Sequence, residues 1–457
     1  MIVKLLLDSK REGRELAPDE IRALVAAYMR GEVPDYQMAA FAMAVCCKGM
    51  TDAETLALTT AMRDSGDCLS WDDLPMPTAD KHSTGGVGDK LSLVIQPLAA
   101  ACGLGVPSLT GRGLGLTGGT ADKMESIPGY VAGLSLADYR EVVAACGCSL
   151  TVQTGEIAPA DKKLYALRDV TGTVPSIPLI VASILSKKLA EGAGTLVFDV
   201  KCGAGAFMKT RPEAVALAEA LVAGAKGAGR KSVALVTAMD EPLGYTVGNA
   251  LEVQEAIDVL RGINGRDARS PSATGETPVV PVGQPVPDVT SLSAELAARM
   301  VSLARDMPLD EARELCLARL ADGTAWARFA EMVRLHGGDL TAFEAHRRVE
   351  DDASSHGVAP RAVDGGFVAS IDAQKVAQAA FELGAGRAQS SDTIDPAAGV
   401  RLLVTHGDKV SAGQPIAELY APTRHERLAA AARLVQEAVS ISSAAPAAKP
   451  LVLEVVE

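Results

Sequence analysis

Apolar residues recur at helical spacing through residues 1–65. The segment that opens at Pro18 places a set of apolar side chains on one helical face, namely Ile21, Leu24, Val25 and Tyr28. A second helix is predicted from Asp35 to Lys48, ending before Gly49, and Thr51 with Glu54 forms a capping box for a third. We expect an N-terminal helical domain that also takes in part of 160–195. The pattern leaves open whether these helices bury their faces within one chain or in a dimer interface.

From about residue 76 the pattern changes to short apolar runs that alternate with glycine loops and helices. The runs predict buried strands at Val106–Leu109, Thr195–Val200 and Ser232–Thr237. Helices are predicted near 90–102, 135–146, 176–190 and 211–228. This alternation predicts an α/β domain over 70–340, with a mostly parallel sheet between helices and ligands at the carboxyl ends of its strands.

The remainder of the chain reads as a loop, a helical block and a β-rich tail. Residues 265–287 are rich in Pro, Ser and Gly, which predicts a linker or surface loop, and helices follow over about 290–350. Gly407–Tyr420 is predicted as strand, turn and strand, and it resembles the hairpins of biotinyl and lipoyl carriers. Those hairpins need a lysine at an exposed tip. This segment has no lysine suited to that position, so we favour a structural role for it. We expect a C-terminal α+β, barrel-sandwich-like domain over 345–457, with further strands at Phe367–Ile371 and Val400–Val404.

Composition and charge narrow the possible partners. Of 457 residues, 48% are hydrophobic and 22% charged, which is typical of a globular protein. A net charge of −13 argues against a general nucleic-acid-binding protein but leaves room for a local basic pocket. The chain shows neither a signal-peptide pattern nor an apolar run long enough for a bilayer, and its eight cysteines match no CxxC zinc motif. We therefore expect a cytoplasmic protein with reduced thiols and no membrane partner.

A glycine-rich stretch from Lys81 to Ser92 is the first candidate site. Its glycines let backbone N–H groups close around an anion, and a helix N-terminus would follow. The stretch matches neither the P-loop nor GxGxxG, so a phosphate site and a plain glycine turn are equally supported by the pattern. His82 favours the phosphate site, because the other histidines lie at or beyond position 336 and an imidazole there is a candidate acid.

Two further groups of residues are candidates. In the run from Thr110 to Glu125, glycines alternate with threonines, which predicts a second anion cradle whose loop is held in shape by Arg112, Asp122 and Glu125. Farther along, Ser183 and Lys187 are spaced to share one helical face, with Arg168 near the end of the preceding segment. By themselves these last three are typical of an ordinary surface.

Together these stretches resemble the family that comprises thymidine phosphorylase and pyrimidine-nucleoside phosphorylase. The resemblance is carried by GRGLGLTGGTADKMESIPG (Gly111–Gly129), RDVTGTVPSIPLIVASILSKKLAEG (Arg168–Gly192) and DVKCGAGAFM (Asp199–Met208), and it extends over nearly the whole chain. The resemblance implies phosphorolysis of thymidine, deoxyuridine or uridine to a free base and a sugar 1-phosphate. Phosphate is then a co-substrate, no cofactor is needed, and a homodimer is expected whose N-terminal helical domain takes part in dimerisation and base binding.

The resemblance also assigns residues to roles. Phosphate would be held by Lys81, Ser83, Ser92, Ser108, Thr110 and Thr120, although Ser108 could instead meet a sugar 2′-hydroxyl or simply pack. The base would be held by Arg168, Ser183 and Lys187, within a mostly apolar pocket of Tyr165, Ile180, Leu114, Val174 and Phe207. His82, Arg168 and Lys187 would be catalytic, with His82 protonating the base carbonyl or donating to it.

This sequence departs from the family pattern at several positions. Thr110 and Leu116 replace a more usual serine and histidine. Some members bind potassium through residues that match Gly88, Lys90, Leu243, Thr246 and Glu255. Here Lys90 replaces a small hydroxyl residue, and its ammonium could occupy the place of the cation, which argues against a bound metal. Two alternatives stay open: a transferase of the same fold, such as an anthranilate phosphoribosyltransferase, and a non-catalytic binding protein.

Overall fold

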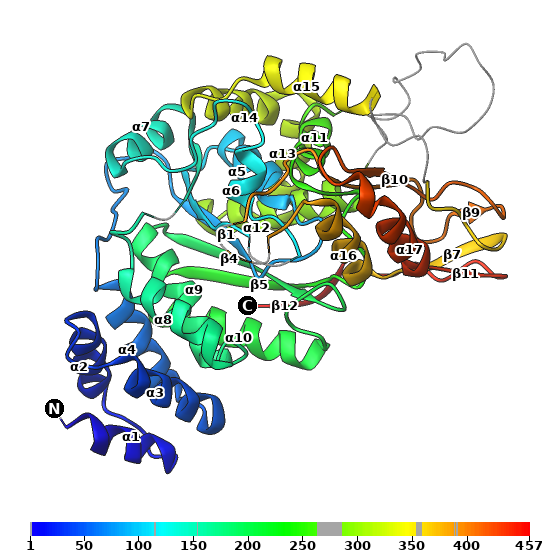
Figure 1. Cartoon of the computed structure of the whole chain (residues 1–457). Coiled ribbons are helices and arrows are strands. Elements are labelled where there is room, and N and C mark those ends of the chain that lie inside the picture. The colour runs from blue at the N-terminus through cyan, green and yellow to red at the C-terminus, as the bar shows by residue number, and fades with distance from the viewer. Residues whose placement is uncertain are drawn as a thin grey trace.

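The computed structural model shows a helical bundle, a central α/β part and a β-rich C-terminal part (Figure 1). The described residues are 2–113, 116–152, 154–262, 286–352, 359–387, 389 and 392–457, with backbone alone at 347–352. Leu114 and residues 265–285 of the expected linker lie outside them. Within these ranges we find no helix that is both long and apolar enough to cross a bilayer.

The N-terminal bundle forms because each helix buries one apolar face against the others. Its members are α1 (Val3–Arg11), α2 (Pro18–Met29), α3 (Asp35–Lys48), α4 (Asp52–Arg63), α8 (Pro159–Thr171) and α9 (Ile177–Glu191). The predicted ends are confirmed: α3 stops at Gly49, whose φ is +73°, and Thr51 and Glu54 cap α4 reciprocally. The Lys10 ammonium and the Glu54 carboxylate form a buried ion pair, 2.7 Å apart, that ties α1 to α4.

A mostly parallel sheet runs through the centre of the molecule, as predicted. Strand β4 (Thr195–Cys202) pairs in parallel with β1 (Ala79–Ser83) and β5 (Lys231–Ala238). Strands β2 (Val106–Thr110) and β3 (Cys148–Val152) pair in parallel, and a bridge from Thr78 to Gly105 joins them to β1. The antiparallel strand β12 (Val452–Val456) completes the β5 edge, so the last residues of the chain return to the central sheet.

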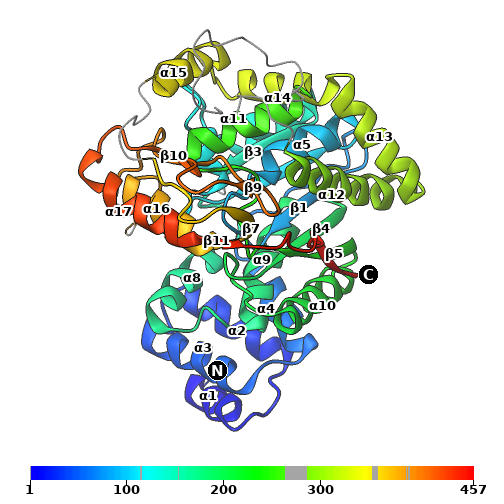
Figure 2. The same cartoon turned by 90° about the vertical axis from the view of Figure 1, so that its right-hand side faces the viewer.

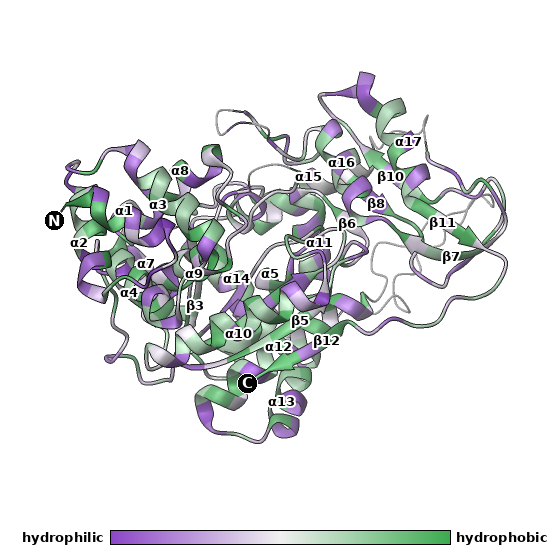
Figure 3. Cartoon of the chain, turned by 90° about the horizontal axis from the view of Figure 1, so that it is seen from below, coloured by the Kyte–Doolittle hydropathy of each residue, from purple (hydrophilic) through white to green (hydrophobic). Residues whose placement is uncertain are grey.

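Helices cover both faces of this sheet (Figure 2). Helices α5 (Leu91–Ala101) and α12 (Pro287–Arg305) lie on one face, and α9 and α10 (Arg211–Gly227) lie on the other. Further helices surround the first face: α6 (Thr120–Met124), α7 (Leu136–Cys146), α11 (Asn249–Leu260), α13 (Leu309–Ala321), α14 (Thr324–Leu335) and α15 (Leu340–Asp352). Strands β5 and β12 are largely hydrophobic, whereas hydrophilic segments lie toward the outside, for example on α13 (Figure 3).

The C-terminal part combines short antiparallel strands with helices. One sheet has the order β10 (Ala417–Tyr420), β8 (Gly399–Leu402), β6 (Thr246–Val247), and another the order β11 (Val439–Ser442), β7 (Gly366–Ile371), β9 (Lys409–Val410). The other elements are α16 (Ala373–Leu383), η1 (His425–Arg427) and α17 (Leu428–Ala438). The hairpin predicted over Gly407–Tyr420 is wrong in its pairing, because β9 bonds to β7 while β10 bonds to β8.

Candidate active site

The carboxyl ends of β1 and β2 and the N-termini of α5 and α6 border a cavity of about 380 Å³. All the residues expected to bind phosphate line it: Lys81, Ser83, Ser92, Ser108, Thr110 and Thr120. One detail of the prediction is wrong: Lys81, His82 and Ser83 belong to strand β1 and not to the glycine loop. The hydrophobic pattern missed this strand end because polar side chains that face the cavity interrupt the apolar run. We call this space the phosphate cavity.

Lys81 and Thr110 carry polar atoms in this cavity that are not hydrogen-bonded within the described residues. The Lys81 ammonium is buried and forms an ion pair with the Asp199 carboxylate, 3.4 Å away, without a hydrogen bond. The Thr110 hydroxyl likewise has no partner among the described residues. The Lys201 ammonium lies 2.8 Å from the same oxygen of Asp199, so two cations share one carboxylate. Buried donors without hydrogen-bond partners favour an anion in this cavity.

The first glycine loop connects the end of β1 to α5. The Ser83 hydroxyl donates to the Asp89 carboxylate at 2.5 Å and accepts from the Gly85 amide at 3.1 Å. Burial raises the pKa of Asp89, but Lys81, Lys201 and Lys123 outweigh this effect and hold that pKa below its ordinary value. Asp89 is therefore ionised at neutral pH, and a bound phosphate would compete with it for the Ser83 hydroxyl.

The second glycine loop is held in shape by Arg112, Asp122 and Glu125, as predicted. Asp122 accepts the amides of Gly113 and Gly119 at 2.6 and 2.9 Å. The Arg112 guanidinium bonds to the Glu125 carboxylate at 2.7 Å. Two separate carboxylates thus fix the backbone on which Thr120 and the loop amides approach the cavity.

A second cavity of about 370 Å³ lies next to the first. All the described residues expected to hold the base or to form its pocket line this cavity, namely Tyr165, Arg168, Val174, Ile180, Ser183, Lys187 and Phe207, while Leu114 lies outside the described residues. The two cavities have His82, Ser83, Thr84 and Arg112 in common. Ligands in the two cavities would therefore meet at the end of β1. We call this second space the base cavity.

The cations of the base cavity already have partners. The buried Arg168 guanidinium donates to the carbonyls of Val174 and Leu179 at 2.8 and 3.0 Å, and its Nε donates to that of Thr173 at 3.3 Å. A guanidinium carries five N–H groups, so this network leaves Arg168 with donors to spare. Burial lowers the pKa of Arg168, although the group stays charged at neutral pH.

Lys187 and Ser183 lie one turn apart on α9, as their spacing predicts. The Lys187 ammonium donates to the Ser183 hydroxyl at 3.1 Å and to the Asp161 carboxylate at 2.5 Å. Asp161, which lies on α8, was not among the residues predicted from the sequence. The sequence feature that could have identified it is its position seven residues before Arg168, which puts both side chains on one face of that helix.

His82 lies where the two cavities meet. Burial lowers the pKa of His82 well below its ordinary value, and the nearby Lys188, Lys187 and Lys81 lower it further. The imidazole is therefore neutral at pH 7. Neutral imidazole still offers one N–H donor.

Three buried charges beside the phosphate cavity also escaped the sequence analysis. Lys188 lines that cavity, and it pairs with the carboxylates of Asp80 and Glu191. Asp199 and Lys201 alternate along β4, so both point to one face of the sheet. Charged residues at alternate positions of an otherwise apolar strand were the signal that could have found them.

Comparison with known proteins places the chain in a family. The model for the helical bundle domain of the glycosyl transferase family matches residues 4–66, and that for its α/β domain matches residues 76–326. The model for the pyrimidine nucleoside phosphorylase C-terminal domain matches residues 367–442.

Curated relatives span nearly the full length of the chain. Thymidine phosphorylase from Mesorhizobium japonicum is 46% identical over 99% of this chain and 98% of its own. Pyrimidine-nucleoside phosphorylase from Geobacillus stearothermophilus is 41% identical over 91% of each chain.

A solved structure shares the fold. Anthranilate phosphoribosyltransferase from Thermus thermophilus has a TM-score of 0.54 and 19% identity, covering 72% of this chain and 98% of its own. The family models and the curated relatives, read together with the two adjoining cavities, lead to one conclusion: the chain belongs to the thymidine and pyrimidine-nucleoside phosphorylase family of glycosyl transferases.

Proposed function

We propose that the chain catalyses the reversible phosphorolysis of pyrimidine nucleosides, with thymidine and deoxyuridine as substrates and uridine as a further candidate. The main observation that supports this proposal is that the phosphate cavity and the base cavity share His82, Ser83, Thr84 and Arg112. Unpartnered donors favour an anion on one side, and an apolar wall with Arg168 and Lys187 suits a planar base on the other. A sugar bound between them would present C1′ to phosphate.

The reaction transfers the sugar from nitrogen to oxygen. A phosphate oxygen attacks C1′ as the bond from C1′ to the base nitrogen breaks, and the electron pair of that bond passes to the pyrimidine. The proton that hydrogen phosphate gives up ends on the base nitrogen, so the products are the sugar 1-phosphate and the neutral base. Arg168 and Lys187 stabilise the negative charge that grows on the base, while phosphate stabilises the oxocarbenium-like sugar. Neutral His82 donates an N–H to a base carbonyl in the same step. No covalent enzyme intermediate is required.

Parallel assays with thymidine, deoxyuridine and uridine test this proposal. We expect release of free base only when phosphate is present, with an equal amount of sugar 1-phosphate. Base release that is independent of phosphate would indicate a hydrolase. Binding of phosphate without turnover of any nucleoside would indicate a binding protein. A phosphoribosyltransferase is disfavoured because Asp122 and Glu125, the paired acidic residues beside the second glycine loop, are already bound by Arg112 and loop amides.

We propose in addition that two copies of the chain pair through the N-terminal helices. Large apolar side chains are exposed on α1 and α3, namely Ile2 just before α1, Leu5, Tyr36 and Met43. Exposed apolar residues gathered on adjacent helices are typical of an interface. Light scattering should give twice the mass of one chain, and Tyr36→Lys should shift the protein toward the monomer. A monomeric wild-type protein at micromolar concentration would refute this pairing.

A further inference from the structure

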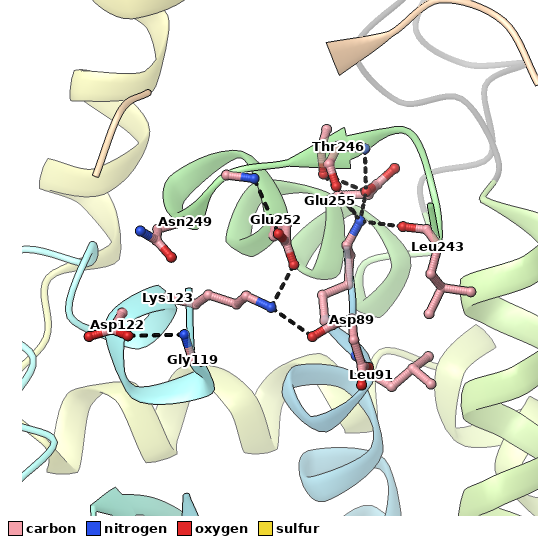
Figure 4. A network of polar contacts seen from close by, with 12 residues as sticks. Asp89, Leu91, Gly119, Asp122, Lys123, Leu243, Thr246, Asn249, Glu252 and Glu255 are labelled. Atoms are coloured by element: carbon pink, nitrogen blue, oxygen red, sulfur yellow. Dashed lines mark hydrogen bonds and ion pairs between the residues drawn. The ribbon is translucent and has the colours of Figure 1, made fainter. Parts of the chain in front are cut away.

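The ammonium of Lys90 is enclosed by oxygen atoms. It donates to the carbonyls of Leu243 and Thr246 at 2.8 and 3.0 Å and to the Thr246 hydroxyl at 3.2 Å. It also pairs with the Glu255 carboxylate. Figure 4 shows Leu243, Thr246 and Glu255 converging from the chain around β6 and α11. Lys90 itself is fully buried.

The surrounding chain leaves no spare room in this cage. Gly244 has a φ of +72°, and a Cβ added there would lie 2.9 Å from the Lys90 Nζ and 2.7 Å from a Glu255 oxygen. Glu255 also accepts the Tyr245 amide at 2.7 Å. Backbone carbonyls, a hydroxyl and a carboxylate are the oxygen donors that hard cations take. A free potassium ion, which the family resemblance implies for these positions, does not fit because the Lys90 ammonium already binds their oxygens.

We propose that Lys90 is a covalently tethered cation that replaces an exchangeable monovalent metal ion. Because this cation is part of the chain, it is not lost at low salt. The structure of the loops beside the phosphate cavity should then be independent of the potassium concentration. Lys90 acts as a positioning residue, since its ammonium lies outside both cavities.

The network around α11 shows what this cation positions. Lys90 directly precedes α5 and follows Asp89, whose carboxylate holds the Ser83 hydroxyl. The Lys123 ammonium, at α6, donates to the Asp89 carbonyl at 2.7 Å and pairs with the Glu252 carboxylate at 2.7 Å (Figure 4). Glu252 and Glu255 lie three residues apart on α11, so one helix anchors both glycine loops.

The experiment removes the tether in two ways. Lys90→Ser opens space for a free ion among the same oxygens, whereas Lys90→Met fills the space without a charge. Thermal unfolding and the KM for phosphate are measured for the full-length protein in tetramethylammonium chloride, sodium chloride or potassium chloride at equal ionic strength. Lys226→Ser, at an exposed lysine, controls for general salt effects.

We expect the wild-type protein to show the same melting temperature and phosphate KM in all three salts. Lys90→Ser should melt lower in tetramethylammonium and raise the phosphate KM on the order of tenfold, and potassium should reverse both changes in proportion to its concentration. Lys90→Met should be impaired equally in every salt.

The proposal fails if potassium specifically stabilises the wild-type protein, or if Lys90→Ser matches the wild type in tetramethylammonium. It also fails if potassium rescues Lys90→Met as well as Lys90→Ser. Should Lys90→Ser not fold, the wild-type and Lys90→Met measurements still decide the matter. The KM arm rests on the proposed phosphorolysis, but the melting arm does not. A wild-type protein without turnover therefore refutes the proposed function and leaves the tethered cation testable.

Discussion

The two adjoining cavities are built on opposite principles. In the phosphate cavity the Lys81 ammonium and the Thr110 hydroxyl have no hydrogen-bond partner among the described residues. In the base cavity Arg168 bonds to three backbone carbonyls and Lys187 bonds to Asp161 and Ser183. The first cavity thus has two polar groups without internal hydrogen-bond partners in the described part of the chain, whereas the cations of the second also hold the chain together.

This contrast separates binding from stability. We expect a substitution of Lys81 or Thr110 to remove a ligand contact and to leave the fold nearly intact. A substitution of Arg168 breaks internal hydrogen bonds as well, so it should affect folding and activity together. The contrast matches the ligands, because a small multiply charged anion needs free donors whereas a weakly polar base needs a rigid, shaped wall.

The largest effect is expected from Lys81→Met. We expect kcat/KM for phosphate to fall by roughly 10²–10³-fold, since a buried cation that meets the transferring anion is lost. Stability should change little, because Lys201 still neutralises Asp199, and Lys201 and Lys123 still face Asp89. Initial rates against phosphate concentration and urea unfolding measure the two effects. A loss below tenfold would show that Lys81 does not contact phosphate.

Arg168→Met should behave in the opposite way. We expect the free energy of unfolding to drop by about 2–4 kcal/mol, because the carbonyls of Thr173, Val174 and Leu179 lose a buried donor. Nucleoside KM should rise at the same time, while phosphate binding in a direct titration is retained. Unchanged stability in urea would contradict the structural half of the comparison.

Asp161→Asn tests a positioning residue of the base cavity. The change keeps the shape but removes the charge that holds the Lys187 ammonium. We expect nucleoside KM to rise about tenfold with phosphate KM unaltered. Lys187→Ala should cost more than Asp161→Asn, since it removes the group that meets the base. Equal effects on the KM of both substrates would argue against a role confined to the base.

The pH dependence of activity tests the role of His82, which lies between the two cavities. Burial and the neighbouring lysines lower the pKa of His82 well below 6.5, so it is neutral across the range from pH 6.5 to pH 8. We expect wild-type kcat/KM for nucleoside to show no ionisation of this histidine in that range. His82→Gln should lower the rate about tenfold or more without changing the profile above pH 6.5. A wild-type inflection near pH 6.5 that His82→Gln abolishes would overturn this assignment.

The smallest effect lies on α11, outside both cavities. Burial raises the pKa of Asp258 to about 6. A carboxyl whose pKa is raised on folding destabilises the folded state when it ionises, so the cost is present above pH 6 and disappears as the pH falls toward 4. Asp258→Asn should therefore raise the free energy of unfolding by about 1 kcal/mol at pH 7.5, and by less at pH 4.5. An equal rise in the free energy of unfolding at both pH values would show that ionisation of Asp258 is not the cause.

Much of the architecture was readable from local patterns. The capping box at Thr51, the glycine that ends α3 and the apolar runs of β4 and β5 each have a local physical cause, and the structure has each of them. The pairing of β9 and β10 with separate sheets was not readable, because register depends on partners far away in the sequence. The return of β12 to the central sheet has the same cause.

Some features of the candidate site could likewise be predicted from local sequence, and others could not. Glycine loops indicated Lys81 and Thr120, whereas Ser183 and Lys187 were indicated only by the family resemblance, because their spacing alone is typical of an ordinary surface. The pairing of Lys187 with Asp161, and of Lys188 with Asp80, comes from contacts between distant segments, which no spacing rule supplies. The neutral state of His82 follows from burial and from three lysines, of which one is adjacent and two are distant in the sequence.

The central claim is that phosphate and nucleoside react directly across the end of β1. The most direct test is turnover of thymidine with fully ¹⁸O-labelled phosphate in ordinary water, followed by mass spectrometry of the sugar product. We predict a sugar 1-phosphate that keeps all the phosphate label, including the oxygen bonded to C1′. Unlabelled free sugar, or a C1′ oxygen that comes from water, would contradict the account.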